Sequence, residues 1–148
     1  MKATSLSIIL GFIVGLILSG VLVDVYSYIK SSVDRIIIAR NISKAEQYVK
    51  DGQYQQAIEI YEKVYAKIKP KKEKNESLFG KVANNLGLSL VQNSGGVKNA
   101  NKNFLNSKQA KQALQMFKEA KDSFLKIKNN KLADQTEHNI QMLEQSIQ

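Results

Sequence analysis

Hydrophobic residues first form one long run near the start of the chain. Residues 6–23, LSIILGFIVGLILSGVLV, contain 18 positions without a charged side chain. As a helix this run is about 27 Å long, close to the roughly 30 Å hydrocarbon core of a bilayer. The apolar core of a secretory signal is usually shorter, about 7–15 residues. The pattern therefore predicts a single transmembrane anchor over residues 1–23, with a cleaved signal peptide as the alternative.

Within this run, small residues recur at every fourth position and so share one face of the predicted helix. The face consists of Ser7, Gly11, Gly15 and Ser19. Because small side chains let two helices approach closely in lipid, we expect this face to pack against another helix, such as that of a second copy. The alternative is that glycine is simply frequent in membrane helices.

The apolar pattern continues beyond the run and predicts a helical stalk over residues 24–40. Its apolar positions are spaced four and three residues apart and comprise Leu22, Tyr26, Ile29, Val33 and Ile36. This stripe either pairs with a second copy as a short coiled coil or folds back on the domain that follows. A Met-Lys start before an apolar run favours an N-terminus inside the cell, so we expect the following domain on the extracytoplasmic side.

Residues 41–70 contain two helical segments separated by a turn. Small and aromatic or branched residues alternate there at helical spacing. They are Ala45, Tyr48, Ala57, Tyr61, Val64 and Ile68. Gly52 lies between the segments and suits the positive φ that ends a helix. This pattern, closed by Pro70, resembles the tetratricopeptide repeat, a helix–turn–helix unit of about 34 residues. Asn41 and Lys44 depart from it, because such repeats usually carry tryptophan and leucine there.

The same pattern returns further along with larger departures. The first helix of a second unit is expected at residues 82–92 and its partner at residues 111–127, separated by a Gly-, Asn- and Ser-rich insertion around residues 94–107. Their matching positions are Leu86, Gly87, Ala113, Phe117 and Ala120. Residues 131–148 resemble the first helix of a third unit, which in solenoids caps the open end. Its stripe is Leu132, Thr136, Ile140, Leu143 and Ile147.

These patterns predict an all-α protein with a transmembrane helix, a helical stalk and a short tetratricopeptide-like solenoid over residues 41–148. The solenoid holds about 2.5 repeats, whereas about three are usually needed for stability. We therefore expect additional support from the stalk, from a second copy or from a partner protein.

The composition excludes several classes of function. The chain has 148 residues, no cysteine, one histidine and a net charge of +9. Without cysteine there is no disulfide and no thiolate metal site. His138 is the lone histidine, and no partner set for nucleophilic or metal chemistry accompanies it. We expect no enzymatic activity, no cofactor and no metal.

The densest basic run is KPKKEK, residues 69–74. It is either a solvated loop between repeats or a surface for anionic lipid or phosphate. Because the run contains no aromatic residue on which bases could stack, nucleic acid is not an expected partner.

The resemblance also implies a binding site. In tetratricopeptide proteins the first helices of successive repeats line a concave groove that holds a peptide or a partner helix. Carried over by position, the groove residues are Ile42, Ser43, Glu46, Lys81, Asn84, Asn85, Leu88, Gln135, His138, Asn139 and Met142. Their amides and lysine can hydrogen-bond a peptide backbone or a carboxylate, and the alternative is that they are merely solvated.

The expected function is accordingly that of a membrane-anchored adaptor or assembly factor that binds a partner protein in this groove. Two alternatives remain open from the residues. One is a structural subunit that self-assembles into oligomers or filaments through its N-terminal helix. The other is a basic surface that docks on anionic lipid or nucleic acid.

Overall fold

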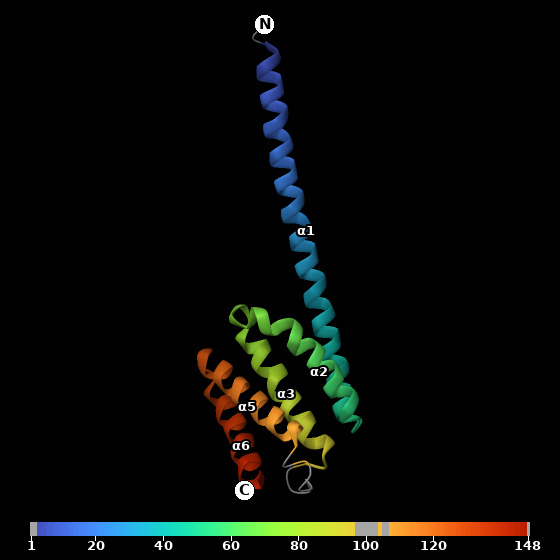
Figure 1. The fold of residues 1–148 in the computed structure, drawn as a ribbon, viewed down its shortest axis with the longest axis vertical. Coiled ribbons are helices and arrows are strands. Elements are labelled where there is room, and N and C mark those ends of the chain that lie inside the picture. Colours follow the sequence, from blue (N-terminus) through green and yellow to red (C-terminus); the bar gives the residue numbers. More distant parts are fainter. Residues whose placement is uncertain (1–2, 97–103, 105–106, 148) are drawn as a thin grey trace. The chain divides into compact units, whose positions relative to one another are not determined.

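The computed structural model describes residues 3–96, 104 and 107–147, without the side chains of residues 3–22, 24, 25, 29 and 147 (Figure 1). The chain divides into two compact units, residues 1–39 (unit 1) and residues 40–148 (unit 2). The helices are α1 (Ala3–Lys50), α2 (Tyr54–Ile68), α3 (Glu76–Asn93), α5 (Lys108–Lys126) and α6 (Asn130–Ile147), with the 3₁₀ helix η1 (Lys69–Lys74) after α2. The described residues form no strand, so the predicted all-α fold class is confirmed.

Helix α1 covers the apolar run, the segment 24–40 and the first helical segment of unit 2. No helix in the part of the chain with described side chains is both long enough and apolar enough to cross a bilayer. Residues 1–22, including the predicted packing face Ser7, Gly11, Gly15 and Ser19, lie outside that part.

Unit 2 begins with a helical hairpin formed by the last turns of α1 and by α2. At the turn, Gln53 N donates a 2.8 Å hydrogen bond to Tyr48 O, and Gly52 N donates one of 3.1 Å to Val49 O. Gly52 has φ 72°, the left-handed conformation that glycine adopts without a steric penalty. The predicted helix end at Gly52 is thus confirmed, and the short turn makes the two helices antiparallel neighbours.

The remaining helices stack in chain order, α2 against α3, α3 against α5 and α5 against α6. The side chains predicted to be buried form the core of this stack. Those with at most 8% exposure are Ala45, Ala57, Tyr61, Val64, Ile68, Leu86, Ala113, Phe117, Ala120, Thr136, Ile140 and Leu143. Tyr48 and Leu132 are half-buried, and the side chain of Ile147 lies outside the described residues.

Two glycines bring α3 and α5 into close contact. A Cβ at Gly87 would lie 2.8 Å from Cε1 of Phe117, and a Cβ at Gly80 would lie 2.8 Å from Cε1 of Phe124. Real Cβ atoms essentially never approach that closely, and both rings are at most 2% exposed. The glycines therefore let the aromatic rings of α5 lie directly on the backbone of α3.

Helix α3 starts earlier than its apolar pattern predicts. Asn75 Oδ1 accepts a 3.2 Å hydrogen bond from Leu78 N and caps the helix that begins at Glu76. After α3 ends, Gly95 and Gly96 adopt positive φ of 97° and 80°. The predicted insertion follows, and within it only Phe104 is described between Gly96 and Ser107. Phe104 is 6% exposed, so this ring packs against the protein.

Candidate partner-binding groove

Three hollows lie side by side along unit 2 and share one residue. The first lies between the end of α1, α2 and α3 and is lined by Glu46, Val49, Lys50, Tyr54, Tyr61, Asn85, Leu88, Ser89 and Gln92. The second lies between α3, α5 and α6, where Leu88, Val91, Gln92, Gly95, Gly96, Phe117, Asn139 and Met142 line it. The third is lined by Asn84, Leu88, Phe124, Leu132, Asp134, Gln135, Thr136, His138 and Asn139. All three adjoin at Leu88, and we call them together the groove.

Leu88 is the apolar centre of the groove. It is 36% exposed, although it lies on α3 next to the buried residues Gly87 and Ser89. The three hollows have volumes of about 250, 310 and 570 Å³, so the second and third fall within the usual range of small-molecule pockets, roughly 300–1,000 Å³. Three adjoining hollows can each take one side chain of a bound peptide or helix.

Amide side chains of α3 and α6 meet above the third hollow. Asn84 Oδ1 accepts a 3.5 Å hydrogen bond from Asn139 Nδ2 and lies 3.4 Å from Thr136 Oγ1, whose proton is donated to Leu132 O at 2.8 Å. These distances to Asn84 are long for hydrogen bonds, so the contacts are weak. The two half-buried amides therefore keep the capacity to bond a peptide backbone instead.

The floor of the first hollow carries a buried phenol. Asn85 Nδ2 donates a 3.4 Å hydrogen bond to the hydroxyl of Tyr61, whose side chain is 1% exposed. Burial raises the pKa of this hydroxyl, and the hydrogen bond from Asn85 only partly offsets that effect. Tyr61 is thus neutral at physiological pH and offers a hydrogen-bonding group at the base of an otherwise apolar hollow.

The hollows bring together most of the groove residues that the sequence predicts. Eight of them line at least one hollow: Glu46, Asn84, Asn85, Leu88, Gln135, His138, Asn139 and Met142. Ile42, Ser43 and Lys81 line none of these three hollows. Ile42 is half-buried, whereas Ser43 and Lys81 are exposed.

Sequence reasoning missed several lining residues that continue the same helix faces. Val49 and Lys50 lie one turn beyond Glu46, and Gln92 lies one turn beyond Leu88. A spacing of three or four residues along each helix could have found them. Tyr54 could not be found this way, because it reaches the hollow from the start of α2.

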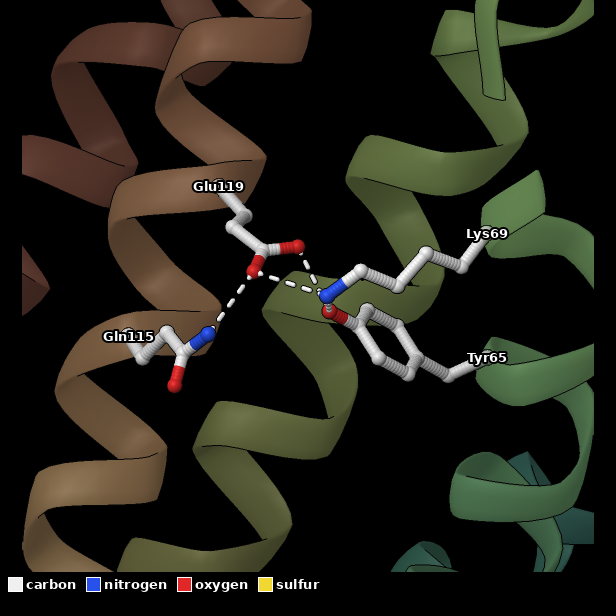
Figure 2. Close-up of polar contacts among 4 residues, drawn as sticks. All are labelled: Tyr65, Lys69, Gln115 and Glu119. Atoms are coloured by element: carbon white, nitrogen blue, oxygen red, sulfur yellow. Dashed lines mark hydrogen bonds and ion pairs between the residues drawn. The ribbon is translucent and has the colours of Figure 1, made fainter. Parts of the chain in front are cut away.

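A separate polar cluster joins α2 and η1 to α5 (Figure 2). The Tyr65 hydroxyl donates a 2.5 Å hydrogen bond to Oε2 of Glu119. Lys69 Nζ lies 2.8 Å from the Tyr65 oxygen and 3.3 Å from Glu119 Oε1, to which Gln115 Nε2 also donates at 3.0 Å. Burial acts to raise the pKa of Glu119, but the hydrogen bonds from Tyr65, Gln115 and Lys69 outweigh it and lower that pKa. This cluster stabilises the stacking of helices some 50 residues apart in sequence.

The groove offers shape and hydrogen bonding rather than reactive groups. Among the described residues, no three or more His, Cys, Asp or Glu side chains are placed to hold a metal ion. His138 lies exposed at the third hollow. Comparison of the chain with protein-family models, with curated proteins and with solved structures finds no match.

Proposed function

We propose that the protein is a membrane-anchored adaptor of the tetratricopeptide type, which binds an extended peptide or a helix of a partner protein in its groove. The observation that carries the proposal is that the three hollows adjoin at the exposed Leu88, which lines all of them. A partially exposed leucine that is surrounded by amides can anchor an apolar side chain of a partner while the amides bond its backbone.

The packing of unit 2 supports the repeat assignment. Helices α2 and α5 each carry a buried alanine four residues before a buried aromatic residue, Ala57 before Tyr61 and Ala113 before Phe117. Helix α6 packs on α5 without a partner helix of its own among the described residues. These features are those of two helical repeats followed by a capping helix.

The predicted membrane anchor, which we call the tether, is the part of the proposal that rests on the sequence. The run of 18 residues without a charge, residues 6–23, is long enough for one crossing. Its test is the intact mass of the protein from alkali-washed membranes. A mass of 16.6 kDa in the membrane pellet supports an anchor. A soluble protein lacking the first 20 or so residues would instead mean a cleaved signal peptide, since such segments are about 15–30 residues long.

The groove is tested by capture of the partner from detergent extracts of the native membranes, with the partner identified by mass spectrometry. Leu88→Glu places a charge in the apolar centre and should abolish capture, and Asn85→Ala should weaken it. The matched control is Ala66→Glu, because Ala66 is also an exposed apolar residue but lies outside the groove. Equal loss with both glutamate variants, or no loss with Leu88→Glu, would refute the groove as the binding site.

One observation favours self-assembly as a second candidate function. In unit 1, large apolar side chains remain exposed, among them Tyr26 at 67%, Val33 at 47% and Ile36 at 68%. They belong to the predicted stalk stripe and could be covered by a second copy in a coiled coil. Replacement of Val33 and Ile36 by glutamate should then abolish an oligomer that forms without any other protein. If the oligomer survives this change, the stalk stripe is not its interface.

A further inference from the structure

The net charge of the protein is concentrated in two short segments. Residues 67–76 and 126–131 contain eight lysines and two glutamates, a net charge of +6 out of +9 for the whole chain. The first segment includes η1, and the second is the end of α5 with its turn into α6. The rest of the molecule is therefore close to electrically balanced.

The fold places these segments at one end of unit 2 (Figure 1). Lys126 Nζ lies 3.1 Å from Oε1 of Glu76, the first residue of α3 and two residues beyond η1. Lys69 of η1 likewise lies 3.3 Å from Glu119, two turns before the end of α5. We call this surface the basic end, defined by residues 67–76 and 126–131.

Several lysines of the basic end keep their charge uncompensated. The two ion pairs above engage Lys69 and Lys126. Four further lysines are exposed and have no carboxylate within 4.0 Å in the part of the chain that the structure describes. These are Lys71, Lys74, Lys128 and Lys131. The basic end is thus a cluster of available cations rather than a closed salt-bridge network.

Exposed apolar side chains alternate with these cations. Leu125 is 47% exposed and Ile127 is 39% exposed, so the sequence Leu125–Lys128 alternates apolar and basic side chains at the surface. Among the described residues of unit 2, the remaining exposed large hydrophobic side chain is Leu88 in the groove. A surface that combines lysines with exposed aliphatic side chains suits the headgroup region of a bilayer, which accepts both.

The backbone at Lys128 adds an independent observation. Lys128 has φ 57°, the one positive φ at a non-glycine residue in the described chain. It ends α5, where Lys128 N and Asn129 N each donate a 2.9 Å hydrogen bond back into the helix. Glycine is the usual residue in this conformation, because a Cβ is disfavoured there. The chain therefore keeps a strained lysine in the middle of the basic end.

We propose that the basic end docks unit 2 onto an anionic lipid surface. The ligand is the phosphate of anionic headgroups, with Leu125 and Ile127 entering the interface beside them. The absence of aromatic side chains from residues 67–76 and 126–131 disfavours single-stranded nucleic acid, which needs stacking platforms. The inference rests on the membrane tether proposed above. Residues 24–39 join unit 2 to the proposed anchor, and this covalent link would raise the effective concentration of the basic end at the bilayer.

The test uses the full chain in proteoliposomes and a single introduced cysteine, which is unique because the chain contains none. A fluorophore at Asn130→Cys reports the basic end, and one at Gln145→Cys reports the other end of the same helix, α6. Lipids with a quencher on the headgroup detect docking. We expect the fluorescence at position 130 to be quenched when phosphatidylglycerol replaces about a third of the phosphatidylcholine. This quenching should disappear at high salt, which screens the charges. Position 145 should stay unquenched.

Charge variants identify the lysines that carry the docking. Lys71→Gln with Lys74→Gln should weaken docking about fivefold for each lysine, which corresponds to about 1 kcal/mol for each. Lys108→Gln with Lys111→Gln is the matched control, because it removes the same charge from exposed lysines at the start of α5. If both pairs weaken binding equally, binding depends on the net charge of the protein and not on the position of the lysines, and the proposal is overturned.

Lys128→Gly separates docking from stability. Glycine relieves the positive φ, so this variant should melt at a higher temperature, yet it should dock about fivefold more weakly. A lysine with a purely structural role would not give these opposite shifts. Unchanged docking of Lys128→Gly would contradict its part in the proposal.

The failure of docking and the failure of the tether give different results. If the proteoliposomes float with the protein but position 130 is never quenched, docking is wrong and the tether stands. If the protein floats only with anionic vesicles and is released by salt, docking stands and the tether is wrong. Binding of an RNA oligonucleotide at position 130 without any lipid quenching would assign the basic end to nucleic acid and overturn the proposal.

Discussion

The contact between Gly87 of α3 and the ring of Phe117 determines how close the two helices lie, and a single methyl group tests it. A Cβ at Gly87 would lie 2.8, 2.9 and 3.1 Å from Cε1, Cδ1 and Cζ of Phe117. The ring cannot move aside freely, because it is 1% exposed. In an unhindered helix, Gly→Ala stabilises by about 1 kcal/mol. Overpacking a core usually costs about 1–3 kcal/mol. Gly87→Ala should therefore destabilise unit 2 by about 1 kcal/mol.

Urea unfolding of residues 40–148, followed by circular dichroism, measures this change. Phe117→Leu removes the ring atoms Cε1 and Cζ, so Gly87→Ala should cost less in that background than in the wild type. The double-mutant cycle should give a coupling free energy of about 1 kcal/mol or more, as is usual for residues in contact. If Gly87→Ala stabilises the protein and shows no coupling to Phe117, the close approach of α3 and α5 is wrong.

Three further predictions concern stability and pH. Ser107→Ala removes the hydroxyl that accepts a hydrogen bond from Ala110 N, so chemical denaturation should show a loss of about 1 kcal/mol, whereas a loss near zero would argue against this cap. Because the pKa of Glu119 is lowered in the folded state, its stabilisation is present above the ordinary value of 4.5 and is lost as the pH falls through the folded value. The difference in unfolding free energy between wild type and Glu119→Gln should thus shrink with acidification, and a pH-independent difference would contradict the cluster. Leu88→Glu should leave stability within about 0.5 kcal/mol of wild type, as expected for a surface site, and a larger loss would make Leu88 a core residue.

The buried stripe of each helix could be predicted from the sequence, because helical spacing alone places residues such as Ala57, Tyr61 and Leu143 on one face. The groove residues came instead from the resemblance to tetratricopeptide repeats, carried over by position, and eight of the eleven line a hollow. Contacts between distant residues could not be predicted in this way. The cluster of Tyr65 and Glu119 depends on two helices more than 50 residues apart, and local periodicity carries no information about their approach.

The helix boundaries show a related limit. The apolar pattern of α3 begins near residue 82, but the helix begins at Glu76, because the side chain of Asn75 caps it. Likewise, Lys128 resembles an ordinary surface lysine in the sequence, and only its positive φ marks it as unusual. The basic run at residues 69–74 can be seen in the sequence, but only the structure shows that residues 126–131 lie close to it.

The most direct test of the central claim is photocrosslinking in native membranes with a photoreactive residue at position 88. The same residue at Gln115, which is exposed on α5 outside the groove, serves as the control. The account predicts one defined protein crosslinked at position 88 and none at position 115. Crosslinking of the same proteins at both positions, or of nothing at position 88 while a partner still co-purifies, would contradict the groove as the binding site.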